Sequence, residues 1–112
     1  MELTSKKYFV YKLIPPRPTF HLDMTDQERT IMRQHSAYWR NLANKGVAVV
    51  FGPVADPHGG WGLAVVEAES EAQVAELGTQ DPAVTSGMAT YEFYAMPMAV
   101  LRESAQSGLD RP

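Results

Sequence analysis

Hydrophobic positions along this chain follow two spacings, and the first of them predicts four strands. Apolar and aromatic runs of strand length occupy residues 8–14, 47–54, 61–67 and 89–100. Short runs of this kind, rich in β-branched and aromatic residues, are typical of strands. A Pro- and Gly-rich turn separates the second run from the third, which predicts an antiparallel hairpin. Pro97 in the last run indicates an edge strand or a bulge.

A helical spacing appears in residues 26–44, where apolar side chains recur about once per turn. Thr25 and Glu28 form the sequence pattern of a capping box, in which each side chain accepts a hydrogen bond from the other residue's amide. The preceding residues 15–24 contain three prolines and show no periodicity. We expect a loop here, and its length is typical of a binding loop or a lid over a pocket.

Two shorter helices are expected in the second half. Ser70 is a natural N-cap for residues 71–77, and Asp81 stands before Pro82 as the cap of a short turn over residues 83–86. The resulting order is β-α-β-β-α-β, the split βαβ or ferredoxin-like arrangement of α+β proteins. It predicts a four-stranded antiparallel sheet whose first and third strands are central, with both main helices on one face.

The opposite face of this sheet is also expected to be apolar, since several predicted strands carry hydrophobic residues on both faces. Two helices cover only one face, and a monomer seldom exposes an apolar patch of that size. The simplest arrangement is a second copy packed sheet to sheet, so the pattern predicts a homodimer.

Composition narrows the picture to one domain of ordinary globular type. The chain has 112 residues, the length of a single domain, and we expect a core over residues 7–101 followed by a polar tail over residues 102–112. The net charge of −3 and the lack of a basic cluster argue against a nucleic-acid partner or an anionic membrane surface. There is no cysteine, no secretory signal and no apolar run long enough to span a membrane. The expected location is therefore the cytoplasm.

Two residues are candidates for acid–base chemistry. His35 lies on the inward face of the predicted long helix, where it is either a core histidine bonded to a backbone carbonyl or an imidazole aimed into a pocket. Histidine titrates near neutral pH and therefore suits proton transfer. Asp81 has the position of a helix cap, but one of its oxygens could cap while the other orients an imidazole.

Four further residues are candidates for substrate contacts. Arg17, in the loop, either clamps an anionic substrate or is solvated. Tyr11, Trp39 and Trp61 either form pocket walls that stack on a ring or belong to the core and the interfaces. The residue types alone leave both possibilities open.

No motif for a metal or a cofactor is present. The three histidines, His21, His35 and His58, lack the spacing of a preorganised zinc site, and no cysteine assists them. The two Gly-containing turns do not precede a helix, so they cannot cradle a phosphate. We therefore expect neither a metal nor a cofactor.

Several short motifs occur in a characteristic order over roughly residues 8–100. They are His35, Tyr38, Gly46, Gly52-Pro53, Asp56, Gly59, Val65-Val66, Ser70-Glu71, Asp81-Pro82 and Gly87. In this order and spacing they resemble the YCII-related family of small dimeric α/β-barrel proteins. The resemblance implies a ferredoxin-like protomer that dimerises through its sheet, with a pocket between sheet and helices.

The resemblance also implies a function. His35 and Asp81 match the positions of the family's proposed acid–base pair. Members with known activity are similar to lyases and isomerases that act on intermediates of aromatic degradation, including dehydrochlorination. The long Pro-rich loop with Arg17 departs from the family pattern, so a particular substrate does not carry over.

The leading hypothesis is therefore a cofactor-independent lyase, isomerase or dehydrochlorinase acting on a small cyclic or aromatic metabolite. His35 would be the general base and Asp81 its orienting partner. Two alternatives stay open at this point. One is a cofactor-free monooxygenase in which Trp39 and Trp61 stack on a phenolic substrate. The other is a non-catalytic module that only binds a small molecule.

Overall fold

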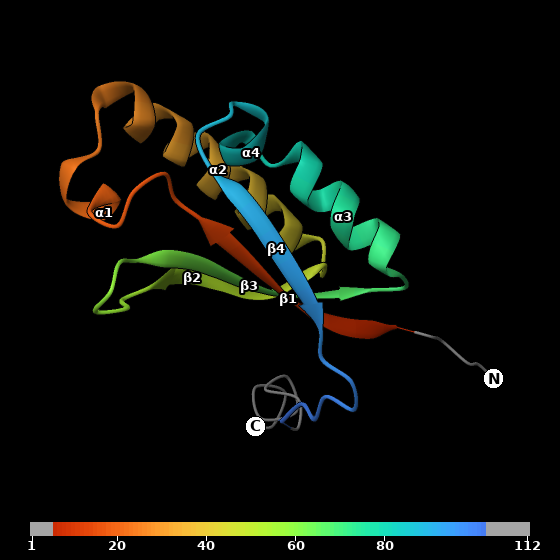
Figure 1. Cartoon of the computed structure of the whole chain (residues 1–112). Coiled ribbons are helices and arrows are strands. Elements are labelled where there is room, and N and C mark those ends of the chain that lie inside the picture. Colours follow the sequence, from red (N-terminus) through yellow and green to blue (C-terminus); the bar gives the residue numbers. More distant parts are fainter. Residues whose placement is uncertain (1–5, 103–112) are drawn as a thin grey trace, which may run out of the picture.

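The computed structural model describes residues 6–102, so the predicted polar tail lies outside the described residues except for Arg102. Within this range the chain forms, in order, β1 (Lys7–Ile14), α1 (Phe20–Asp23), α2 (Asp26–Asn44), β2 (Ala48–Val54), β3 (Trp61–Ala68), α3 (Glu71–Gln80), α4 (Pro82–Thr85) and β4 (Thr90–Ala95) (Figure 1). The predicted caps are present: Thr25 and Glu28 form the capping box of α2, and the Ser70 side chain accepts from the third residue of α3.

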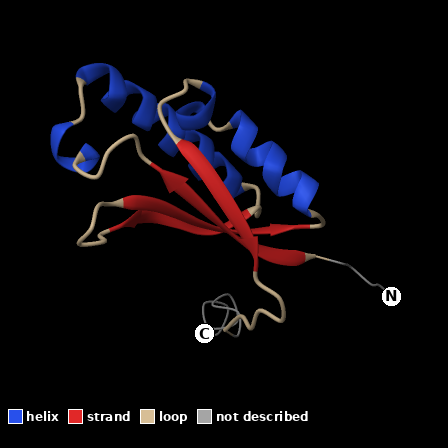
Figure 2. Cartoon of the chain, in the orientation of Figure 1, coloured by secondary structure: helices blue, strands red, loops and turns tan. Residues whose placement is uncertain are grey.

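The strands of the described chain form one antiparallel sheet in the order β2-β3-β1-β4. The helices lie together on one side of this sheet, and the described part of the chain places no helix on the other side (Figure 2). The α+β, ferredoxin-like fold predicted from the sequence is therefore confirmed, with β1 and β3 in the centre.

Side chains of β1 alternate between the two faces of the sheet. Phe9, Tyr11 and Leu13 are buried under the helices, whereas Val10 and Lys12, between them, are only partly buried. Because neighbouring strands continue this alternation across the sheet, the fold has a helix face and an open face. The core lies on the helix face.

The open face carries a row of apolar residues that crosses the whole sheet. Val10 on β1 is paired with Val65 on β3 and with Tyr94 on β4, and Val65 is paired with Val50 on β2. Val50 and Tyr94 are 54% and 56% exposed. The second apolar face expected from the sequence is therefore present.

Three differences from the prediction exceed a shift of one residue at an element end. The loop of residues 15–24 contains the short helix α1, whose Phe20 is buried; a single buried side chain leaves no periodicity in the sequence. Strand β4 ends at Ala95 instead of continuing to residue 100, because Pro97 has no amide hydrogen and Met98 has a left-handed φ of 59°. Helix α3 continues through Gly78 to Gln80, beyond the predicted end.

Gly78 is kept inside α3 by its contact with the sheet. A Cβ atom at this position would lie 2.3–2.6 Å from three ring atoms of Tyr91 on β4. That ring has little freedom to move, since it stacks on Tyr11 and its hydroxyl donates to the Ala75 carbonyl at 3.0 Å. The close approach of α3 to β4 therefore depends on a glycine.

We expect Gly78→Ala to destabilise the protein although alanine favours helices. The gain in helix propensity is up to ~1 kcal/mol, whereas overpacking a rigid contact costs about 1–3 kcal/mol. Urea unfolding should show a net loss of stability, and Thr79→Ala on the exposed side of the same helix should show none. A Gly78→Ala protein as stable as the parent would contradict this account of the helix.

Candidate active site

Asp81 stands where α3 ends and α4 begins, and its carboxylate has four hydrogen-bond partners. Oδ1 accepts from the backbone N–H of Ala83 at 2.9 Å, and Nδ1 of His35 lies 2.9 Å from the same oxygen. Oδ2 accepts from Nε1 of Trp39 at 2.8 Å and from the Tyr11 hydroxyl at 3.0 Å. The predicted cap of α4 is confirmed. The same side chain also joins β1 and α2 to the turn between α3 and α4.

The carboxylate of Asp81 is fully buried yet ionised. Burial acts to raise its pKa, but hydrogen bonds from His35 and Trp39 outweigh this effect and leave the pKa of Asp81 below its usual value. Burial and the adjacent carboxylate both raise the pKa of the Tyr11 hydroxyl, which therefore keeps its proton. Asp81 is thus a pure acceptor surrounded by donors.

This environment fixes the form of the His35 ring. A carboxylate has no proton to donate, so Nδ1 of His35 must carry the hydrogen, and Nε2 is then the basic nitrogen of the neutral ring. The His35 side chain is 13% exposed and lines a cavity. Nε2 is therefore the ring nitrogen that remains available to a molecule in this cavity.

The cavity lies on the helix face of the sheet, between β1, β2, β3 and α2, and the loop of residues 15–24 borders it. Its volume of about 630 Å³ is within the usual range of ligand pockets. Most of its wall is apolar. The apolar side chains include Leu13, Phe20, Met24, Met32, Phe51 and Met88.

Two of the predicted substrate contacts, Tyr11 and Trp39, line the cavity beside His35. Their ring centroids lie 4.8 Å apart. The hydroxyl of Tyr11 and the Nε1–H of Trp39 are both occupied by Asp81. Both residues are 1% exposed, so only a small part of each ring borders the cavity. Their contact with a substrate stays a prediction.

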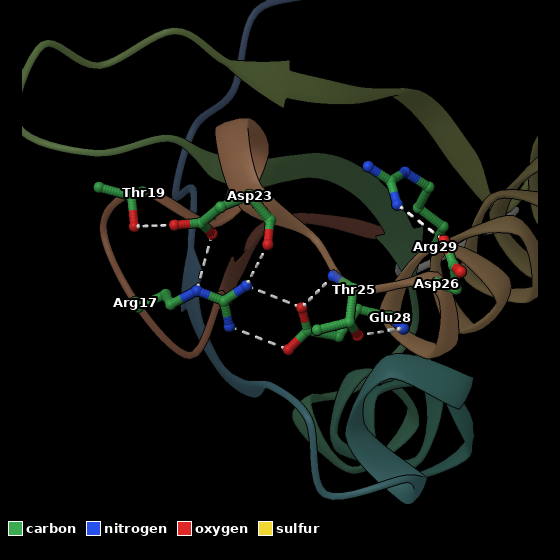
Figure 3. A network of polar contacts seen from close by, with 7 residues as sticks. All are labelled: Arg17, Thr19, Asp23, Thr25, Asp26, Glu28 and Arg29. Atoms are coloured by element: carbon green, nitrogen blue, oxygen red, sulfur yellow. Dashed lines mark hydrogen bonds and ion pairs between the residues drawn. The ribbon is translucent and has the colours of Figure 1, made fainter.

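Arg17 lies in the loop between β1 and α1, and its guanidinium is bound by two carboxylates. It is not among the cavity-lining residues. Its Nη1 and Nη2 donate to both carboxylate oxygens of Glu28 at 2.9 and 2.8 Å, and its Nε donates to Oδ1 of Asp23 at 2.8 Å (Figure 3). The guanidinium therefore fastens the loop to the start of α2, and its contact with an anionic substrate stays a prediction.

Trp61 borders the cavity, but its ring is engaged on the other side of the sheet. Its Nε1 donates to Oδ2 of Asp56 at 3.0 Å, and the Lys12 ammonium lies 4.9 Å from the ring centroid. Lys12 belongs to the open face, because its neighbours Tyr11 and Leu13 are buried on the helix face. The ring of Trp61 is therefore not placed to stack on a substrate beside His35.

Several cavity residues were not predicted from the sequence. Met32 and Ser36 lie on α2 three residues before and one residue after His35, so helical spacing could have identified them. Phe51 and Met88 reach the cavity only through the strand order and the turn after α4. No local signal in the sequence indicates these two.

Two other kinds of feature are absent from residues 6–102. None of the helices in this range is both long and apolar enough to cross a membrane. No group of three or more His, Asp or Glu side chains there is placed to hold a metal ion.

Two of the solved structures that are similar to this chain are a dehydrochlorinase and an oxygenase. One is the 5-chloro-2-hydroxyhydroquinone dehydrochlorinase TftG from Burkholderia phenoliruptrix AC1100, in complex with 2,5-dihydroxybenzoquinone. It is 16% identical, with a TM-score of 0.53 over 81% of this chain and 95% of that chain. Another is SnoaB, a cofactor-independent oxygenase from Streptomyces nogalater, which is 10% identical, with a TM-score of 0.48 over 90% of this chain and all of that chain.

Sequence comparison gives the family directly. No curated protein sequence matches the chain significantly, but the family model of the YCII-related domain matches residues 9–97. This match covers β1 through β4 and includes both His35 and Asp81. The chain belongs to the YCII-related family.

Proposed function

We propose that the cavity is the active site of a cofactor-independent enzyme that removes a proton from a small cyclic or aromatic substrate. His35 is the general base, through Nε2, and Asp81 is the positioning residue that holds the ring. The single observation that carries this proposal is the contact of 2.9 Å between Nδ1 of His35 and Oδ1 of a fully buried carboxylate. It supplies a fixed tautomer and a counter-charge for the imidazolium.

The chemistry follows from these two groups. Nε2 takes a proton from a ring carbon, and the electron pair of the broken C–H bond forms a new double bond. In an elimination, a leaving group such as chloride departs with the electron pair of its bond to carbon, and Nε2 then releases the proton to water. In an isomerisation, the pair moves along a conjugated system and the imidazolium returns the proton to another atom. The Asp81 anion stabilises the imidazolium between these steps.

A solved structure of similar fold supports this class of reaction. The dehydrochlorinase of similar fold acts on a chlorinated hydroxyhydroquinone, a small ring compound of the kind that suits an apolar cavity with a basic nitrogen in its wall. The predominantly apolar wall also lowers the polarity around the reacting atoms, which strengthens the electrostatic effect of Asp81.

Proton exchange provides a test that does not require the natural substrate. A panel of hydroxylated and chlorinated cyclic compounds, including 2,5-dihydroxybenzoquinone, would be incubated with the protein in D₂O and followed by NMR. A general base in the cavity should catalyse deuterium incorporation at ring C–H positions, or release of chloride from chlorinated members. Binding without exchange across the panel would indicate a non-catalytic binding module.

We also propose that the protein functions as a homodimer that buries the open face of the sheet. The row formed by Val10, Val50, Val65 and Tyr94 supports this, since an apolar strip across a whole sheet is unfavourable in water. A specific interface of this kind typically buries ~1,200–2,000 Å² in total.

A charge in the middle of this row should separate the protomers. Light scattering should give a dimer for the parent protein at micromolar concentration and a monomer for Val65→Glu, because an unpaired carboxylate would be buried in the interface. Gln34→Glu adds the same charge on the exposed side of α2 and should remain dimeric. A monomeric parent protein would contradict the proposed assembly.

A further inference from the structure

His21 is a second imidazole at the cavity and takes no part in the His35–Asp81 pair. It lies on α1 and lines the same cavity as His35. Unlike His35 it is exposed to solvent, so it stands at the mouth of the cavity. Among the described residues its ring has no hydrogen-bond partner within the protein.

The loop that carries His21, residues 15–24, is fastened to α2 on one side. Arg17 forms a bidentate ion pair with Glu28, and the Thr19 hydroxyl donates to Oδ2 of Asp23 at 2.8 Å (Figure 3). Hydrogen bonds from Arg17 lower the pKa of Glu28 to about 2, so this carboxylate is ionised at neutral pH. Glu28 also accepts from the amide of Thr25, which joins the loop to the capping box of α2.

On its other side the loop touches the turn between β2 and β3, and Gly59, whose φ is +130°, permits this close approach. A Cβ atom at Gly59 would lie 3.0 Å from Cα and Cβ of Pro18. A Cβ atom at Gly60 would make an ordinary contact of 3.7 Å with Nδ1 of His21, which shows that the imidazole lies beside this turn. Figure 1 shows α1 between the start of α2 and this turn. His21 is therefore held at a fixed place, which favours its use as a preorganised contact.

The remaining polar groups of the cavity are few. Tyr11 and Trp39 are occupied by Asp81, and Trp61 is occupied by Asp56. What remains for a ligand is Nε2 of His35 with the neighbouring Ser36 hydroxyl on α2 and, at the mouth, the ring of His21 together with the partly exposed carboxylate of Asp56, which accepts from Trp61 and from the backbone N–H of His58. Apolar side chains fill the wall between these two polar places.

We propose that His21 is a specificity-determining residue that binds a second polar group of the substrate at the mouth of the cavity. The substrate is then a ring system with hydrogen-bonding groups at both ends, one near His35 and one near His21. This inference rests on the proposed function in one respect, namely that the end of the substrate that reacts lies at His35.

The size of the cavity and its charges define the class further. A cavity of about 150 Å³ accommodates benzene, so about 630 Å³ has room for more than one ring. Arg17, the cation nearest in sequence, is neutralised by two carboxylates. A hydroxyl or carbonyl group therefore fits the mouth better than a carboxylate does.

Three two-ring probes test the proposal by calorimetric binding, without any turnover. They are 2,6-dihydroxynaphthalene, 2-hydroxynaphthalene and 6-hydroxynaphthalene-2-carboxylate, which differ only in the group at one end. The parent protein should bind the dihydroxy probe about 2- to 10-fold more tightly than the monohydroxy probe, as one additional hydrogen bond predicts. His21→Phe should abolish this preference and leave the affinity for 2-hydroxynaphthalene unchanged.

His58→Phe is the matched control, since His58 is 94% exposed and does not line the cavity. It should keep the preference for the dihydroxy probe. Equal affinities in the parent protein, a preference that persists in His21→Phe, or no binding of any probe would overturn the assignment of His21. Tightest binding of the carboxylate probe would overturn the choice of a neutral group. Absence of deuterium exchange would contradict only the role of His35 as a base. The assignment of His21 would stand, because the binding preference does not depend on proton transfer.

Discussion

Replacing His35 by glutamine should lower the rate of deuterium exchange at least ~100-fold, because a positioned general base contributes roughly 10²–10⁴-fold. Glutamine has a similar length and its amide can still donate a hydrogen bond to Asp81, but it has no basic nitrogen for a substrate proton. The substitution therefore removes the base and keeps the volume of the side chain and a donor to Asp81. Exchange rates at saturating substrate, followed by NMR, give the comparison.

Two further variants separate the base from other effects of the substitution. His58→Gln alters an exposed histidine outside the cavity and should leave the exchange rate unchanged. His35→Ala leaves space in the cavity wall, and added imidazole should restore part of the lost rate. If His35→Gln exchanges protons as fast as the parent protein, the base is another group.

The fold was predictable because its signals are local. Hydrophobic spacing gave the element order, and the caps at Thr25 and Ser70 marked the starts of the two main helices. The differences between prediction and structure arise where contacts between residues distant in the sequence determine the element. Gly78 continues α3 because its lack of a side chain lets the helix approach Tyr91, and no sequence pattern encodes that approach. Helix α1 contains Phe20, whose side chain is buried and lines the cavity.

The site was predictable in part, for the same reason. The cap formed by Asp81 is a local feature, but its bonds to Trp39 and Tyr11 span 42 and 70 residues and depend on the packing of α2 and β1. The partners of Arg17 and Trp61 were not predictable from the sequence, because they are set by the folded loop and by the strand register. A lone cation or indole in a sequence does not reveal which side of a sheet it faces.

The four donors around Asp81 also explain why an amide cannot replace its carboxylate. If asparagine puts its NH₂ group in place of Oδ1, the group faces the N–H of Ala83, which cannot accept. If it puts the NH₂ in place of Oδ2, it faces the Nε1–H of Trp39, which cannot accept either. Either orientation leaves one buried donor without a partner.

We therefore expect Asp81→Asn to lower the free energy of unfolding by about 2–4 kcal/mol, since a buried unpaired donor and weakened bonds to a formerly charged acceptor act together. Denaturant unfolding at pH 7 measures the change. Asp26→Asn is the control: that side chain is fully exposed at the start of α2, and the expected change is within ~0.5 kcal/mol. A loss for Asp81→Asn no larger than for the control would contradict the role of the buried carboxylate.

The same pair of proteins should also differ in pH dependence. The pKa of Asp81 lies below its ordinary value of 3.8 in the folded protein, so its ionised form stabilises the fold fully above about pH 4. This contribution is lost as the pH falls through the folded-state pKa, because protonation of the carboxylate removes an acceptor from its donors. Asparagine does not titrate. The gap in unfolding free energy between the parent protein and Asp81→Asn should therefore narrow below pH 4, and a gap that stays constant down to pH 2 would mean that Asp81 is not held as an anion.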